Sequence, residues 1–336
     1  MRLLIVGVLG VLATTVSTIS SEDIMLEEWN AFKAAHGKAY PNQKEDASRM
    51  KVYMKNKVKI VKHNQLAHKG NHSYFLKMNR FGDLLPSEIA ALYGLQHVGL
   101  NKTQTEYLDA TFIAPEGFEA PTEVDWRTKG AVTEVRDQGK CGSCFAMAVA
   151  GSVESQHFRK TGKLISLSVQ QLVDCSQPFD DVCKGGALLF AFKYIQDKGI
   201  DTEKSYPYVS GKTGVMQKKC HFNKSTVGST ITGMARVPKG DENALALAVA
   251  ANGPTTIQVD ASGFQFLYYS HGIYSHDDCS NNIYDINHAM LIVGYGPGYW
   301  LVKNSWGKGW GMKGYIKFKR GINMCGIAND PMYPLS

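Results

Sequence analysis

The distribution of cysteine divides this chain of 336 residues into two unlike parts. All seven cysteines lie after residue 140, whereas residues 22–95 contain no cysteine and little glycine. In an oxidising compartment cysteines pair, so an odd number leaves one thiol unpaired. Counting alone does not identify that thiol. The candidates are Cys141, Cys144, Cys175, Cys183, Cys220, Cys279 and Cys325.

The N-terminus, MRLLIVGVLGVLATTVSTISS, combines a positive charge at Arg2 with an apolar run from Leu3 to Ala13. This run is too short for a bilayer, which requires about 20 apolar residues. We interpret residues 1–20 as a cleavable secretory signal rather than a buried N-terminal helix, with cleavage near residues 17–21. No other segment is long and apolar enough to predict a membrane span. The sequence therefore predicts the secretory pathway, ending in a lysosome or in an extracellular or digestive lumen.

The cysteine-free part has helical periodicity. The stretch MLEEWNAFKAAHG places Leu26, Trp29 and Phe32 at helical spacing, and residues 43–68 form a second, longer helical candidate. In that candidate, Met50, Tyr53, Ile60 and Val61 lie on or near one stripe. Residues 96–120 lose this periodicity and are typical of a linker.

The composition changes from Pro121 onward. Residues 144–160 and about 186–198 are predicted helices, and the chain after Gly228 favours strands such as TTIQVD and AMLIVGY. Helices followed by strands indicate an α+β body with a cleft between two lobes. The net charge of +7 comes from scattered basic residues, so we expect no nucleic-acid partner.

Cys144 stands directly before an apolar run, in QGKCGSCFAMAVAGSVE. It is either a structural cysteine or a nucleophile at a helix N-terminus, where the helix dipole lowers a thiol pKa from its usual value of about 8.5. Such a nucleophile needs an imidazole and donors for an oxyanion, and the Gln138 amide and the Cys144 N–H are candidates. No second CxxC and no βαβ pattern supports a zinc or thioredoxin-type site, and no cofactor or metal is implied.

The histidine that would activate this thiol is not determined by chemistry alone. His288 is favoured because it opens the apolar strand HAMLIVGY, and Asn304 at the end of the next strand could orient its ring. Trp306 could keep water away from that contact. A purely structural role for His288 is equally compatible with the pattern. The candidates in the cysteine-containing part are His157, His221, His271, His276 and His288.

These residues carry a resemblance. The segments QGKCGSCFA, NHAMLIVGYG, YWLVKNSWGKGWGMKGYIKFKR and NMCGIA are similar to the papain-like cysteine proteases, specifically the cathepsin L group. Upstream, the chain also resembles the helix motif and the following short motif of that family's inhibitory propeptide. The matching residues are Glu45, Arg49, Tyr53, Asn56, Ile60, Asn64, Asn79, Phe81 and Asp83.

The resemblance implies a papain-like fold, with a helical lobe and a β-barrel-like lobe preceded by a helical propeptide. It implies a signal peptide at 1–20, an inhibitory propeptide at 21–119 and a mature domain at 120–336. Cys144 would be the nucleophile, His288 its base, Asn304 the residue that orients His288, and Gln138 part of the oxyanion hole. The implied disulfides are Cys141–Cys183, Cys175–Cys220 and Cys279–Cys325, with Cys144 free.

The implied function is a cysteine endopeptidase that works through a thiolate–imidazolium pair and an acyl-enzyme, made as an acid-activated zymogen. A catalytically silent scaffold of the same fold is the alternative, and an exopeptidase would need an added loop that we do not see. The implied partners are protein substrates, the chain's own propeptide and cystatin-type inhibitors, and the mature enzyme would be a monomer. The sequons at Asn71, Asn101 and Asn223 are candidate glycan sites.

The resemblance also places the substrate pocket. Asp330 would close the base of the second specificity pocket, and Gln258 would stand on its wall. If the Asp330 carboxylate points into that pocket, it would admit arginine or lysine as well as leucine or phenylalanine. The alternative is a solvated Asp330 that points outward. The full set of implied substrate-binding residues is Gly185, Gly186, Ala187, Leu188, Gln258, Ile286, Asn287, Ala289, Trp306 and Asp330.

Overall fold

The computed structural model describes residues 20–93, 110–178, 181–276 and 278–336. Residues 1–19 of the predicted signal peptide, the candidate glycan acceptor Asn101 and residues 96–109 of the predicted linker lie outside these ranges. Within the described residues, no helix is both long and apolar enough to cross a membrane.

The described residues form α-helices, short 3-10 helices and strands. The α-helices are α1 (Ser21–His36), α2 (Gln43–His68), α3 (Pro86–Tyr93), α4 (Cys144–Thr161), α5 (Val169–Cys175), α6 (Leu188–Lys198), α7 (Ser210–Thr213), α8 (Glu242–Asn252) and α9 (Phe264–Leu267). The 3-10 helices are η2 (Val182–Lys184), η3 (Lys224–Thr226) and η4 (Met324–Gly326). The strands are β1 (Tyr74–Leu76), β2 (Ala110–Thr111), β3 (Val124–Asp125), β4 (Ile200–Asp201), β5 (Val227–Ser229), β6 (Gly233–Arg236), β7 (Thr255–Val259), β8 (Tyr269–Tyr274), β9 (His288–Gly296), β10 (Tyr299–Lys303), β11 (Tyr315–Lys319) and β12 (Met332–Leu335).

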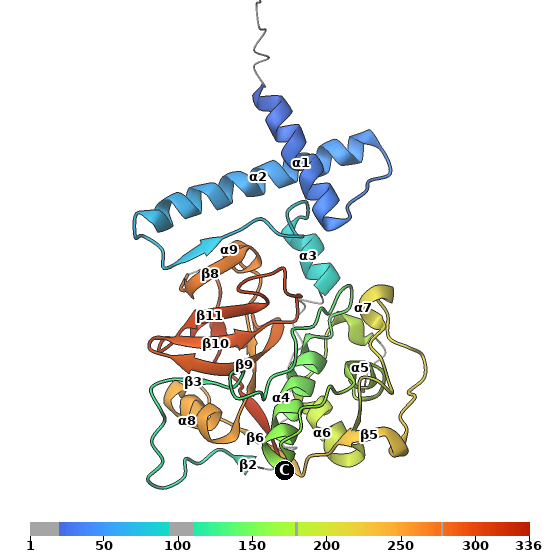
Figure 1. Ribbon diagram of the computed structural model, residues 1–336, viewed down its shortest axis with the longest axis vertical. Coiled ribbons are helices and arrows are strands. Elements are labelled where there is room, and N and C mark those ends of the chain that lie inside the picture. Colours follow the sequence, from blue (N-terminus) through green and yellow to red (C-terminus); the bar gives the residue numbers. More distant parts are fainter. Residues whose placement is uncertain (1–19, 94–109, 179–180, 277) are drawn as a thin grey trace, which may run out of the picture.

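Helices α1 and α2 cross each other above the rest of the molecule (Figure 1). Trp29 and Phe32 of α1 pack with Tyr53 of α2 in a small buried aromatic core. The Trp29 indole N–H also donates to the Asp46 carboxylate of α2 over 3.0 Å. This core is separate from the two larger ones below it, whereas Ile60 of α2 and Tyr93 of α3 belong to the core of the sheet lobe. The segment from α1 to α3 is called the N-terminal unit below.

The helical lobe is built around α4, which runs between the sheet and the helices α5 and α6 (Figure 1). Phe145 and Val149 of α4 and Phe192 of α6 are completely buried in its core. The helix ends at Gly162, whose φ of 74° is the left-handed conformation that glycine adopts at low cost. The first turn of α4 lies next to the sheet of the other lobe, since the Cys144 sulfur contacts the N–H of Ala289 in β9.

The other lobe is a ten-stranded sheet with the order β1-β8-β11-β10-β9-β7-β12-β6-β2, while β3 pairs with β9. The central strand β9 is buried along its whole length, which agrees with its unbroken apolar sequence. It pairs antiparallel with β10 and β7, and α4 packs against it. The sheet thus presents the start of β9 to the start of α4.

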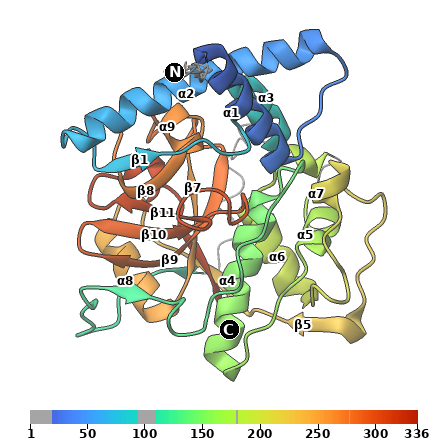
Figure 2. The same cartoon turned by 45° about the horizontal axis from the view of Figure 1, so that its top comes forward.

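The N-terminal unit is docked onto the sheet lobe by a strand and by amide side chains. Strand β1 pairs antiparallel with β8, so the segment after α2 extends the sheet (Figure 2). The Asn56 amide of α2 donates to the Tyr268 hydroxyl over 3.0 Å, and the Asn79 amide donates to the Leu267 carbonyl over 2.8 Å. These contacts place α3 over the junction of the two lobes.

The structure contains the disulfides Cys141–Cys183, Cys175–Cys220 and Cys279–Cys325, and Cys144 is free. These are the pairs that the family resemblance implied. Two of them lie in the helical lobe. Cys279–Cys325 joins the loop after β8 to η4 in the sheet lobe.

Candidate functional site

Cys144 is the first residue of α4 and is only 5% exposed. Ser143 precedes it as the N-cap without making a side-chain capping bond, and the first turn carries no acidic residue. The helix N-terminus therefore keeps its N–H groups and its partial positive charge available for an anion at the sulfur. Burial nevertheless raises the thiol pKa, and the backbone N–H groups of Ala289, Phe145 and Cys144 itself act in the opposite direction.

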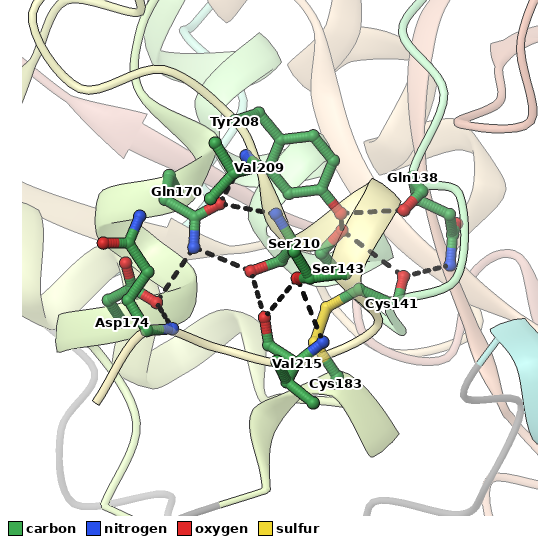
Figure 3. The surroundings of a disulfide bond; sticks show 12 residues. Gln138, Cys141, Ser143, Gln170, Asp174, Cys183, Tyr208, Val209, Ser210 and Val215 are labelled. Carbon is green, nitrogen blue, oxygen red and sulfur yellow. Dashed lines mark hydrogen bonds between the residues drawn. A yellow bond between two sulfur atoms is a disulfide. The ribbon is translucent and has the colours of Figure 1, made fainter. Parts of the chain in front are cut away.

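The loop before Cys144 is held by a disulfide and by a phenol (Figure 3). The Tyr208 hydroxyl donates to the Gln138 carbonyl over 2.8 Å and lies 2.6 Å from the Ser143 hydroxyl. Cys141 is bonded to Cys183, and the Gly142 N–H donates to the Cys183 carbonyl over 2.7 Å. The loop is therefore fixed from two sides.

The Gln138 side chain is completely buried between the two lobes. Its carbonyl oxygen accepts from the Ser305 hydroxyl over 2.6 Å, which orients the amide. Its NH2 group donates to the Cys141 carbonyl and to the Tyr93 carbonyl, each over 3.1 Å. Tyr93 belongs to α3, so the N-terminal unit places a peptide carbonyl on the group that sequence reasoning assigned to an oxyanion hole.

His288 opens β9 and is 2% exposed. Its Nε2 lies 2.8 Å from the Asn304 side-chain oxygen, and the Trp306 ring is 4.9 Å away between centroids. Within the described residues, His288 Nδ1 has no hydrogen-bond partner. A neutral imidazole that donates through Nε2 keeps the lone pair of Nδ1 free to take a proton.

The electrostatics of this site favour uncharged side chains while the N-terminal unit is docked. Burial lowers the pKa of His288 to about 4, although the Asn304 contact opposes this change. Burial also raises the pKa of the Cys144 thiol. Both effects disfavour a thiolate–imidazolium pair because each charged form loses its solvation.

The N-terminal unit covers the site with aromatic and charged contacts. The rings of Phe81 and Tyr93 pack edge-on against Trp306, with centroids 5.4 Å and 5.7 Å away. Arg80 forms an ion pair with Asp137, the residue next to Gln138. The N-terminal unit therefore contacts Trp306 through two aromatic rings and Asp137 through an ion pair, on either side of Gln138.

The implied substrate-binding residues form two groups on opposite lobes. Gly185 and Gly186 follow η2 in the helical lobe, and a Cβ atom at Gly186 would stand 2.5 Å from the Phe145 ring. Glycine at 186 is therefore required for close packing against the α4 start. Leu188 is the first residue of α6 and Ala187 precedes it as the N-cap, and both are buried.

The second group lies in the sheet lobe, around the start of β9. Ala289 lines the same cavity as Cys144. The Asn287 side chain accepts from the Ala261 N–H over 2.9 Å and donates to the Asp260 carboxylate over 3.0 Å, which fixes the entry to β9. Ile286 is buried beside Gly326.

Asp330 was expected either to point into the specificity pocket or to point outward into solvent. It is 5% exposed, so the alternative in which a solvated Asp330 points outward is wrong. The Gln258 amide donates to Asp330 Oδ2 over 3.3 Å, and Arg236 Nε lies 2.6 Å from Asp330 Oδ1. The carboxylate is buried because it has an ionic partner that the sequence reasoning did not include.

The other candidate histidines lie away from this site. His157 is near Ser229, His221 is near Tyr206, and His271 and His276 face the docked N-terminal unit. Sequence reasoning missed Ser305 and Tyr208, which hold Gln138. Ser305 could have been inferred because it follows the candidate site residue Asn304 directly. No motif in the sequence indicates that Tyr208 lies near the site.

Comparisons with known proteins agree with this geometry. A family model described as "Papain family cysteine protease" matches residues 120–335, and one described as "Cathepsin propeptide inhibitor domain" matches residues 29–89. The first match includes every residue from Gln138 to Asp330 discussed above. The second includes α2 and most of the contacts that dock the N-terminal unit.

Similar proteins match over nearly their full length. The chain is 45% identical to "Cathepsin L-like peptidase" of Aedes aegypti, covering 100% of both chains, and 45% identical to "Cathepsin L" of Sarcophaga peregrina, covering 99% of each. Among solved structures, digestive procathepsin L 3 of the Tenebrio molitor larval midgut is 37% identical with a TM-score of 0.83. That match covers 93% of this chain and 99% of the other.

Proposed function

Since this chain belongs to the papain family of cysteine proteases and is the zymogen of a cathepsin L-like endopeptidase, we propose that Cys144 is its nucleophile and His288 its general base. The main support is a free thiol at a helix N-terminus, beside the N–H of Ala289, the neighbour of His288. The catalytically silent scaffold finds no support in the comparisons.

In the proposed reaction, the imidazole of His288 takes the thiol proton and the Cys144 sulfur attacks the peptide carbonyl carbon. The oxyanion that forms accepts hydrogen bonds from the Gln138 NH2 group and the Cys144 N–H. The imidazolium then gives its proton to the leaving amine, and the C–N bond breaks. This step leaves an acyl-enzyme thioester and releases the first product.

The second half of the reaction uses the same groups in the opposite sense. His288 takes a proton from water, the hydroxide attacks the thioester carbonyl, and the C–S bond breaks to release the acid. Asn304 holds the imidazole ring in one orientation throughout, and Trp306 covers that contact. The two steps regenerate the thiol and the neutral imidazole.

This proposal is tested by covalent labelling of acid-processed enzyme with an epoxide-bearing peptide. We expect one label per molecule on Cys144, located by peptide mass spectrometry, and loss of activity in proportion to labelling. The Cys144→Ser variant should fold, keep its disulfides and show neither label nor activity. Activity in that variant, or a label on another residue, would contradict the assignment.

The domain boundaries are also part of the proposal. We propose a signal peptide at 1–20, an inhibitory propeptide at 21–119 and a mature enzyme at 120–336. The Pro121 carbonyl accepts from the Tyr295 hydroxyl over 3.0 Å, so the chain is already joined to the sheet lobe there. N-terminal sequencing of the acid-processed product should give a start near Ala120 or Pro121.

The propeptide inhibits the enzyme in the same molecule, and we propose that acid releases it. Its docked segment puts the Tyr93 carbonyl on Gln138, where a substrate carbonyl would bind. Histidines His63 and His72 of the propeptide stack at 4.3 Å between ring centroids, near His276 of the protease domain. Protonation of His63 at low pH would place a positive charge within this stack.

Location and further partners follow from the sequence and the relatives. We propose that the enzyme acts in a lysosome or a digestive lumen after passing through the secretory pathway. Relatives include a cathepsin L and a digestive procathepsin of a larval midgut. We also propose that the mature enzyme is a monomer, that cystatin-type proteins inhibit it, and that the exposed Asn71 and Asn223 carry glycans.

A further inference from the structure

The structure links the nucleophile to a buried ion pair through successive strands of the sheet lobe. Ala289 lines the same cavity as Cys144 and pairs with Gln258 in the β7–β9 ladder. Residues directly opposite each other in an antiparallel ladder project to the same face of the sheet. The Gln258 side chain is therefore on the face of the sheet that meets Cys144.

Gln258 is joined to Asp330 on that face. Its amide donates to Asp330 Oδ2 over 3.3 Å, and the Asp330 side chain is 6% exposed. The other carboxylate oxygen, Oδ1, lies 2.6 Å from Arg236 Nε. Both oxygens of this buried carboxylate are thus already engaged by groups of the enzyme itself.

Arg236 is held in place by the backbone as well as by the ion pair. It lies on β6 opposite Met332 of β12, and the next residue, Val237, donates its N–H to the Pro331 carbonyl over 2.9 Å. The strand that carries Arg236 and the segment that carries Asp330 therefore move together. The Arg236 side chain is 22% exposed, so its charge is only partly screened by water.

We propose that Arg236 determines the charge selectivity of the specificity pocket beside Cys144, so that the enzyme prefers an apolar side chain there over arginine or lysine. The inference rests on the proposed function and on the family resemblance, which implies that Asp330 lies in the pocket for the second residue before the cleaved bond. It replaces the expectation that Asp330 attracts cationic substrates. Arg236 acts on the substrate through Asp330 and is a positioning residue.

The physical reason is that the Asp330 carboxylate is already paired with the Arg236 guanidinium, so the pair carries no net negative charge. A substrate cation entering it would compete with Arg236 for one carboxylate and would be repelled by the guanidinium. The burial of Asp330 raises its pKa, while Arg236 and Lys239 act in the opposite direction. An apolar side chain carries no charged or polar group that must lose its water, so it enters the pocket without this cost.

The test compares peptides that differ only in the second residue before the cleaved bond, which is leucine, arginine or glutamate. The wild type should prefer leucine. In Arg236→Gln, kcat/KM for the arginine peptide relative to leucine should rise about tenfold or more, because Asp330 becomes free to pair with the substrate. Arg236→Lys keeps the positive charge and should behave like the wild type.

A second variant keeps the test informative if Arg236→Gln does not fold. Asp330→Asn leaves the Arg236 cation without its carboxylate, so the glutamate peptide should gain relative to leucine and the arginine peptide should lose. The double variant Arg236→Gln/Asp330→Asn should lose both charge preferences. Arg127→Gln is the matched control, since it breaks the exposed Arg127–Asp125 ion pair of β3 and should change no ratio.

Titration of active sites with the epoxide-bearing peptide separates the two proposals. An enzyme that neither labels at Cys144 nor cleaves any of the peptides would contradict the proposed function. An active, fully titrated wild type that cleaves the arginine and leucine peptides equally well would overturn the role of Arg236. Unchanged ratios in both Arg236→Gln and Asp330→Asn would do the same.

Discussion

Hydroxyl groups hold the amide that we assign to the oxyanion hole. Ser305 donates to the Gln138 side-chain oxygen over 2.6 Å, and Tyr208 donates to the Gln138 main-chain oxygen over 2.8 Å. The first contact directs the NH2 group towards the Cys141 and Tyr93 carbonyls, and the second fixes the backbone that carries it. Because an oxyanion hole must be formed before the charge develops, such positioning contributes to the rate and not only to stability.

Removal of the Tyr208 hydroxyl should therefore reduce catalysis. In Tyr208→Phe the ring remains, but the loop loses its bonds to Gln138 and Ser143, each worth about 1 kcal/mol. We expect kcat/KM to fall about tenfold, with most of the loss in kcat. The measurement is peptide hydrolysis by acid-processed enzyme, normalised to titrated active sites.

A matched control is available on the surface. Tyr284 is 78% exposed, and Tyr284→Phe removes the same atom from the same residue type without touching the site. It should leave kcat and KM unchanged. Equal kinetics for Tyr208→Phe and wild type would show that the loop keeps its geometry without the phenol.

At the scale of elements, local periodicity predicted the helices well. The expected helices at 43–68 and 144–160 appear as α2 (Gln43–His68) and α4 (Cys144–Thr161). Within α2, Tyr53 and Ile60 are buried, whereas Val61 of the expected stripe is 46% exposed. A stripe inferred from spacing is wider than the face that its partner covers.

Contacts between distant elements could not be predicted in the same way. The pairing of β1 with β8 joins residues about two hundred positions apart, and neither strand carries a signal for the other. The Arg236–Asp330 ion pair was missed for the same reason. The order of catalytic motifs came from the family resemblance, since residue chemistry alone left several histidines open as the base.

We expect low pH to weaken the contact between α2, β1 and β8, because it contains a buried histidine. Burial lowers the pKa of His63 from its usual 6.5, while the hydrogen bond with the Tyr74 carbonyl opposes this change. The neighbouring His72 and His276 lower the pKa further. The docked propeptide thus favours neutral His63, and the released one binds more protons. The contribution of neutral His63 to docking is therefore fully present above pH 6.5 and is lost as the pH falls below it.

The variant His63→Gln should therefore shift zymogen processing to lower pH, because one proton-driven contribution to release is gone. The rate of conversion to the mature enzyme, followed by gel and by peptide hydrolysis across pH 4–7, measures this shift. His157→Gln is the control, since burial also lowers the pKa of His157 but that residue is in the protease domain beside Ser229. An unchanged processing profile in His63→Gln would remove His63 from the mechanism.

At the scale of the whole molecule, a polar network joins the two lobes around the cavity that Cys144 lines. The Glu154 carboxylate of α4 accepts from Arg136 over 2.6 Å and from the Thr133 hydroxyl over 2.5 Å. Lys303 at the end of β10 donates to the Thr133 carbonyl over 2.8 Å. The site that we propose as catalytic is therefore bordered by an interface in which the Glu154 side chain is only 1% exposed and the Arg136 side chain 20%. Removal of one partner from such a buried pair leaves the other charge without compensation.

Lys303 makes that dependence measurable by pH. Burial lowers its pKa from 10.5 to about 8, mainly opposed by Glu154. Between these values the unfolded chain binds more protons than the folded one, so this group makes the free energy of unfolding rise with pH. The stability gained should be largest near pH 10 and absent below pH 8.

The comparison of Lys303→Met with its parent isolates this contribution. Both chains should carry Cys144→Ser to prevent self-cleavage, and urea unfolding at pH 7–10 gives the free energies. We expect the parent to gain stability relative to Lys303→Met across that range, because the tyrosines that titrate at higher pH are common to both. Lys308→Met, at an exposed ion pair with Glu134, should show no such trend. If the difference in the free energy of unfolding between the two chains stays constant with pH, Lys303 remains protonated in the folded protein. The interface between the lobes would then contain a charged Lys303 throughout this pH range.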